Sequence, residues 1–170
     1  NGNAKFDQQD YSGAIAEYDK LLKLDNEKEE ALFKRGYAKY KIGNFKDGFE
    51  DFSKIIKLYP KNYSAFLHIG NIKMELKDIK SAIFFYDKAI ELNPSFTDAF
   101  YNRGNAYFDL KNYQNAITDY SKAIEINNND GEAYYSRGLA KLKLNKFQSA
   151  CEDLNTAYRL GDDQSKSLIL

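Results

Sequence analysis

The sequence predicts an all-α fold built from a repeated pair of helices, and three observations support it. Valine is absent from the 170 residues, which disfavours a strand-rich fold because β-branched residues are enriched in strands. Apolar residues follow helical spacing along most of the chain. Glycine and alanine recur with a constant step of 34 residues, at Gly36, Gly70, Gly104 and Gly138 and at Ala31, Ala65, Ala99 and Ala133.

The stretch 97–130 shows how one step is organised. Apolar residues recur with helical spacing over 99–110 and again over 116–126. Lys111 and Asn112 mark a short turn between the two helices, and the polar residues 127–130 end the second one. Gly104 lies in the middle of the first helix, where glycine costs about 1 kcal/mol relative to alanine. We therefore expect that the second helix approaches closely at this point.

This 34-residue unit resembles the tetratricopeptide repeat (TPR), of the type found in bacterial proteins. The resemblance is carried in 97–130 by Phe100, Gly104, Tyr107, Ala116, Tyr120 and Ala123. It implies a single right-handed superhelical solenoid of antiparallel helix pairs over residues 1–170. The implied parts are a truncated repeat at 1–28, full repeats at 29–62, 63–96, 97–130 and 131–164, and the start of a further or capping helix at 165–170. Because Asn1–Ala4 aligns with Arg103–Ala106, we also expect the chain to be part of a longer protein.

The resemblance further implies a non-catalytic scaffold that binds a peptide or protein segment on the concave wall formed by the first helices. The implied wall residues are Phe33, Tyr37, Tyr40, Leu67, His68, Asn71, Met74, Tyr101, Asn102, Asn105, Phe108, Tyr135 and Leu139, with Asn3 and Phe6 continuing them. Asparagine carries a donor and an acceptor, so we expect it to hold the amides of an extended peptide. Tyrosine supplies the amphipathic area that is typical of binding hot spots. The alternative is that the aromatic side chains only pack between repeats.

Three repeats share a pair of opposite charges sixteen residues apart. The pairs are Arg35 and Asp51, Arg103 and Asp119, and Arg137 and Asp153. The repeat 63–96 has Ile69 and Phe85 in these places and so loses both partners together. We therefore predict a partly buried ion pair between the two helices of a repeat.

Composition excludes several other kinds of site. One cysteine and one histidine cannot form an internal disulfide, a thiolate cluster or a common zinc site. We predict no catalytic residue, no cofactor and no metal, and we expect Cys151 in the core. Family members that bind chaperones hold a C-terminal carboxylate with a clamp of asparagines and cationic residues. If Asn71 and Asn102 are taken as the clamp asparagines, the cationic positions hold Leu67, Glu132 and Ser136. We therefore expect no such clamp in this chain.

The sequence also bears on partners and roles other than a protein-binding scaffold. Zero net charge and only four arginines argue against binding of RNA or other nucleic acid. No apolar run approaches the ~18–20 residues of a membrane span, so we expect a soluble chain, with the cytoplasm favoured. Self-association into a homo-oligomer through exposed solenoid ends remains open, as does a role as the interaction arm of a larger enzyme or receptor.

Overall fold

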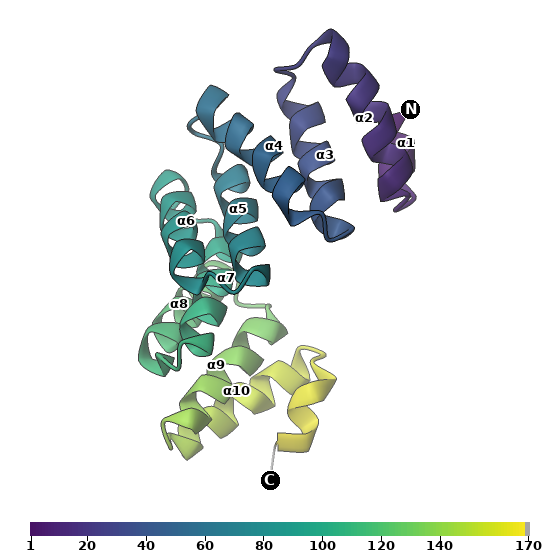
Figure 1. Cartoon of the computed structure of the whole chain (residues 1–170). Coiled ribbons are helices and arrows are strands. Elements are labelled where there is room, and N and C mark those ends of the chain that lie inside the picture. The colour runs from purple at the N-terminus through teal and green to yellow at the C-terminus, as the bar shows by residue number, and fades with distance from the viewer. Residues whose placement is uncertain (169–170) are drawn as a thin grey trace. The chain divides into compact units, whose positions relative to one another are not determined.

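The computed structural model describes residues 1–168 and contains only helices over that range, which confirms the all-α prediction (Figure 1). The chain divides into two compact units, with the boundary between Leu92 and Asn93. No helix within residues 1–168 has the length and apolar character needed to cross a bilayer.

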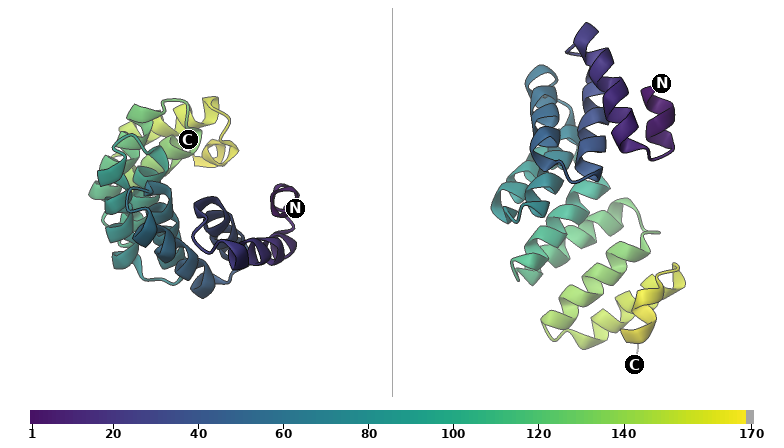
Figure 2. Two further views of the ribbon diagram at one scale, coloured as in Figure 1. Left: turned by 90° about the horizontal axis from the view of Figure 1, so that it is seen from above. Right: turned by 45° about the vertical axis from the view of Figure 1, so that its right-hand side comes forward.

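Unit 1 contains three helix pairs. Its helices are α1 (Gly2–Asp7), α2 (Tyr11–Leu24), α3 (Glu29–Lys41), α4 (Phe45–Leu58), α5 (Tyr63–Glu75) and α6 (Ile79–Leu92). Each helix packs against the next one along the chain, as Figure 2 shows for α1 beside α2. The first helices α3 and α5 also contact each other. They therefore form a continuous layer within the unit.

Unit 2 contains two helix pairs and a short final element. Its helices are α7 (Thr97–Asp109), α8 (Tyr113–Ile126), α9 (Gly131–Lys143), α10 (Phe147–Arg159) and the 3-10 helix η1 (Asp163–Leu168). The first helices α7 and α9 contact each other, and η1 packs on α10. The further helix that we expected to open at residue 165 thus begins at Asp163 and is a 3-10 helix. The last two residues of that expected segment, Ile169 and Leu170, lie outside the described residues.

The turn inside each helix pair uses one residue with a left-handed backbone. These residues are Gln9, Gly43, Lys77, Lys111 and Asn145, with φ between 57° and 79°. The short turn predicted at Lys111 and Asn112 is confirmed. Asn112 then caps α8, because its Oδ1 accepts a hydrogen bond from the backbone N of Asn115 at 3.3 Å.

Close approach of the two helices explains the recurring glycines. A Cβ placed on Gly104 would lie 2.7 Å from Cε1 of Tyr120, which is shorter than any tolerated carbon–carbon contact. Tyr120 is 1% exposed and packs with Ala116, which is fully buried. There is therefore no room for a side chain at position 104, so glycine is required. Its low helix propensity is offset by burial of the tyrosine ring.

The predicted ion pairs are present in all three repeats. The Nε atoms of Arg35, Arg103 and Arg137 donate to Oδ2 of Asp51, Asp119 and Asp153 at 2.9, 2.8 and 2.8 Å. The three carboxylates are 3–5% exposed, so the pairs are largely desolvated. Each arginine also donates to the other carboxylate oxygen, which gives the bidentate geometry that arginine favours.

Lysine joins two of these pairs. Lys39 Nζ lies 2.9 Å from Oδ2 of Asp51, and Lys141 Nζ lies 2.7 Å from Oδ2 of Asp153. Each lysine therefore supplies a second cation to a buried carboxylate. The repeat 97–130 holds Tyr107 at the equivalent position.

Asp119→Ala should lower the free energy of unfolding by about 3–5 kcal/mol, because it removes the buried carboxylate that binds Arg103 in a bidentate pair. The double change Arg103→Ile with Asp119→Phe copies Ile69 and Phe85 and should cost less. Urea unfolding followed by circular dichroism compares the two. A double variant that is as unstable as Asp119→Ala, or less stable, contradicts the assignment.

Candidate functional site

Aromatic side chains from consecutive first helices gather into one cluster in unit 1. This cluster, the unit-1 wall, consists of Phe6, Phe33, Tyr37, Tyr40 and His68 on α1, α3 and α5. Tyr37 links it, because its ring centroid lies 5.6 Å from that of Phe6, 6.4 Å from that of Tyr40 and 5.2 Å from that of His68. All five side chains are half-buried. The structure therefore brings together predicted wall residues that lie far apart in the sequence.

His68 is the polar member of the unit-1 wall. Its ring stacks on Phe52 with centroids 5.1 Å apart and meets Phe33 edge-on at 5.2 Å. Nδ1 is buried and has no hydrogen-bond partner among residues 1–168. Burial, with a smaller contribution from the charge of Lys41, lowers the pKa of His68 to about 4. The imidazole is therefore neutral at pH 7 and behaves as part of the aromatic surface.

Two of the predicted asparagines, Asn71 and Asn105, have partners inside their own helix pairs. Oδ1 of Asn71 accepts a hydrogen bond from the Tyr86 hydroxyl at 2.8 Å, and Oδ1 of Asn105 accepts one from Tyr120 at 2.7 Å. These two tyrosines are 1% exposed, so each hydroxyl needs an acceptor within the fold. The amide oxygens that we expected to accept from a peptide backbone therefore already accept from tyrosine.

A sequence signal for this bond exists, although our sequence analysis missed it. Asparagine stands fifteen residues before the tyrosine in three repeats, as Asn3 and Tyr18, Asn71 and Tyr86, and Asn105 and Tyr120. Where the later residue is Phe52 or Leu154, which has no hydroxyl, the earlier position holds Tyr37 or Leu139. Asparagine thus occurs at the earlier position in the repeats whose later position holds a tyrosine.

Other predicted residues differ in how far they reach the surface. Leu67 is only 5% exposed and belongs to the core, whereas Met74, Asn102, Phe108 and Leu139 are half-buried. The expectation of a core position for Cys151 needs correction, because this residue is only partly buried. Among residues 1–168, no group of three or more His, Cys, Asp or Glu side chains is placed to hold a metal ion.

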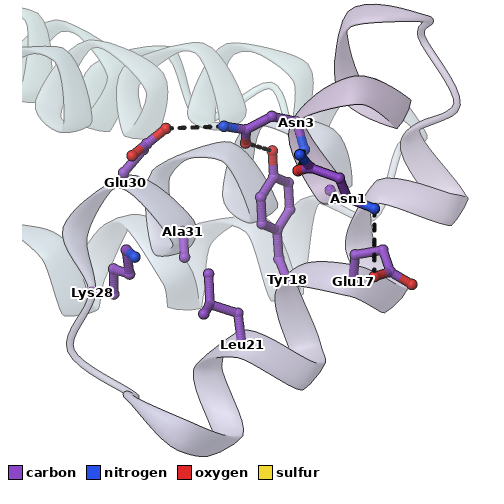
Figure 3. A pocket seen from close by; sticks show the side chains of 9 residues that line it. Asn1, Asn3, Glu17, Tyr18, Leu21, Lys28, Glu30 and Ala31 are labelled. Atoms are coloured by element: carbon purple, nitrogen blue, oxygen red, sulfur yellow. Dashed lines mark hydrogen bonds and ion pairs between the residues drawn. The ribbon is translucent and has the colours of Figure 1, made fainter.

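A small polar pocket lies at the first helix pair (Figure 3). Its volume is about 250 Å³, and Figure 3 shows Asn3 and Tyr18 meeting at its edge. Oδ1 of Asn3 accepts from the Tyr18 hydroxyl at 2.7 Å, while its Nδ2 donates to Oε1 of Glu30 at 3.4 Å. Asn3, which we placed on the wall, is thus tied to residues of α2 and α3.

A larger cavity of about 390 Å³ lies in unit 2. Its lining comes from α7, from α9 and from the segment that leads into η1. The lining residues include Tyr101, Glu132, Tyr135, Ser136 and Asp162. The Tyr101 hydroxyl donates to Oε1 of Glu132 at 2.9 Å and lies 3.2 Å from Oγ of Ser136. Burial raises the pKa of Tyr101 to about 12, so the hydroxyl keeps its proton at neutral pH. The repeat pattern indicated Tyr101 and Tyr135 but not the acidic residues beside them.

Comparisons with known proteins agree with this architecture. Models of the tetratricopeptide repeat match residues 2–43, 30–62, 70–111, 97–130 and 131–160. The chain belongs to the tetratricopeptide repeat family. No curated protein matches its sequence. The TPR fold supports a role as a protein-interaction scaffold, and TPR modules generally carry no catalysis.

Solved TPR structures resemble the chain over nearly its full length. One crystal structure of MamA is 30% identical, with a TM-score of 0.86 over 97% of this chain and 96% of that chain. A second MamA structure is also 30% identical, with a TM-score of 0.82 over 97% and 90%. YrrB, described as a TPR protein with an unusual peptide-binding site, is 23% identical with a TM-score of 0.77 over 98% and 86%. YrrB therefore supports the fold alone.

A double-mutant cycle tests the tyrosine–asparagine bond. Asn105→Ala should lower the free energy of unfolding by about 1–3 kcal/mol, because it leaves the buried Tyr120 hydroxyl without its acceptor. Tyr120→Phe should be destabilising in the wild type but neutral or stabilising in the Asn105→Ala background. Urea unfolding of the four proteins gives the coupling free energy, for which we expect about 1 kcal/mol. A coupling near zero would show that the bond contributes nothing.

The single histidine allows a direct pH test. Because the chain has one histidine, its ring protons give one set of NMR signals. Their titration should give a pKa of about 4. Since the folded pKa lies below the unfolded value of about 6.5, the unfolded chain binds more protons between these values, and stability falls as pH falls through this window. His68→Phe should remove this part of the pH dependence. A titration midpoint above 6 contradicts the buried placement.

Proposed function

We propose that the chain binds an extended segment of a partner protein on the walls of its first helices and performs no chemistry on it. The observation that carries this proposal is the unit-1 wall, where five half-buried aromatic rings from three first helices form one surface. Rigid aromatic area of this kind is enriched at the centres of protein interfaces. The peptide-binding site named for YrrB is a precedent within the same fold.

Tyr37 argues against a purely structural role for the wall. Its position is held by asparagine in three other repeats, where that residue serves a buried tyrosine. The partner of Tyr37 on the second helix is Phe52, which has no hydroxyl to satisfy. The packing of α3 against α4 therefore does not require a tyrosine at position 37. Its ring instead extends the aromatic surface toward Phe6 and His68.

Binding of defined peptides tests the proposal. A phage library of random decapeptides is selected on the wild type, and the enriched peptides are synthesised for fluorescence anisotropy. The wall variant carries Tyr37→Asn, which copies the residue of three other repeats, together with Tyr135→Ala in unit 2. We expect its affinity to fall at least about tenfold, as loss of aromatic anchors typically causes.

The matched control is Phe84→Ala on α6. Phe84 is 55% exposed and lies on the second helix α6, outside the unit-1 wall, so its loss should leave the affinity unchanged. Circular dichroism and urea unfolding establish that all variants are folded. A folded wall variant that binds the selected peptides as the wild type does contradicts the proposal.

A further inference from the structure

The cavity of unit 2 is acidic. Glu132 and Asp162 contribute carboxylates, Tyr101, Tyr135 and Ser136 contribute hydroxyls, and the lining contains no lysine or arginine. Its volume of about 390 Å³ lies near the lower end of small-ligand pockets, which span about 300–1,000 Å³. The space therefore suits one side chain better than a large ligand.

The Glu132 carboxylate is held in place without being neutralised. Tyr101 donates its single hydroxyl proton to Oε1, so Ser136 donates in turn to the Tyr101 oxygen. This chain of hydrogen bonds runs from α9 through α7 and back to α9. Glu132 forms no ion pair with the lysines and arginines of residues 1–168. A fixed carboxylate beside an open cavity is thus left without a counter-ion.

Asp162 is fixed in a similar way. Its Oδ2 accepts a hydrogen bond from the backbone N of Ser165 at 3.1 Å, at the start of η1. It too forms no ion pair within the described part of the chain. The two carboxylates come from different elements, and both line the same cavity.

The equivalent place in unit 1 has the opposite character. Two repeats earlier, the positions of Tyr101, Glu132, Tyr135 and Ser136 are held by Phe33, Ser64, Leu67 and His68. Phe33 packs against His68 with ring centroids 5.2 Å apart, and Leu67 is 5% exposed. The acidic cavity is therefore not a general consequence of the repeat, since the same positions close with apolar contacts in unit 1.

We propose that this cavity binds the basic side chain of an arginine or lysine in the partner segment, an inference that rests on the function proposed above. The oriented Glu132 carboxylate would accept charge-assisted hydrogen bonds from a guanidinium or ammonium group, which are about twice as strong as neutral ones. The tyrosine rings of the lining add a surface on which a cation is stabilised. Arginine suits the site best because its planar group offers several donors to two carboxylates and the hydroxyls.

Parallel selections test the inference. The random decapeptide library is selected on the wild type, on Glu132→Gln and on the control Glu152→Gln, an exposed carboxylate of α10 outside the cavity. Glutamine is isosteric with glutamate and can still accept from Tyr101. We expect the wild type and the control to enrich peptides with arginine or lysine at one fixed position, and Glu132→Gln to lose this enrichment.

Affinities of one synthesised peptide complete the test. Glu132→Gln should weaken the enriched peptide at least about tenfold, while a peptide with norleucine in place of the basic residue should bind the wild type and Glu132→Gln alike. Selected peptides that depend on the walls but show no basic preference, or that keep it on Glu132→Gln, overturn this inference and leave the proposed function standing. Peptides whose binding is insensitive to the wall variant overturn both.

Discussion

The close contact between a glycine of the first helix and a bulky side chain of the second is the constraint on which each helix pair depends. Tyr120 fills the space that a Cβ on Gly104 would need. Sixteen residues separate the two positions in every repeat, so the same contact recurs with phenylalanine or leucine. Where the bulky residue is tyrosine, its hydroxyl is buried with the ring, and a nearby asparagine oxygen accepts a hydrogen bond from it.

Buried charge is the second consequence of this tight pairing. Asp51, Asp119 and Asp153 lie at the position just before the bulky residue of each second helix and are nearly excluded from water. Each is bound by an arginine of the first helix, and Arg35 and Arg137 also reach Asp19 and Ser121 of the preceding helix pair. These arginines thus link neighbouring repeats as well as the two helices of one repeat. Burial makes such a link geometrically demanding, so it fixes how the helices stack within a unit.

The helix pairs and the ion pairs were predictable from one sequence because the repeats of the chain can be aligned with one another. The helix pairs follow from the 34-residue period, and the ion pairs follow from the joint loss of both partners at Ile69 and Phe85. The role of Asn105 carried a similar signal, but a polar residue on an inner wall equally suggested a ligand contact. The burial of Leu67 could not be predicted, because it depends on side-chain packing within unit 1 and not on the period. The acidic cavity could not be predicted either, because its lining combines α7 and α9 with residues around the start of η1, which lie outside the full repeat pattern.

We therefore expect function at residues that are not needed to pack the two helices of a repeat together. These residues are those of the aromatic unit-1 wall and Glu132 in unit 2. The most direct measurement is an amide chemical-shift map of the ¹⁵N-labelled chain titrated with its tightest selected decapeptide. The account predicts that the largest shifts fall on the first helices of a unit, α1, α3 and α5 in unit 1 or α7 and α9 in unit 2. Shifts concentrated on the second helices α4, α6, α8 and α10 would contradict it.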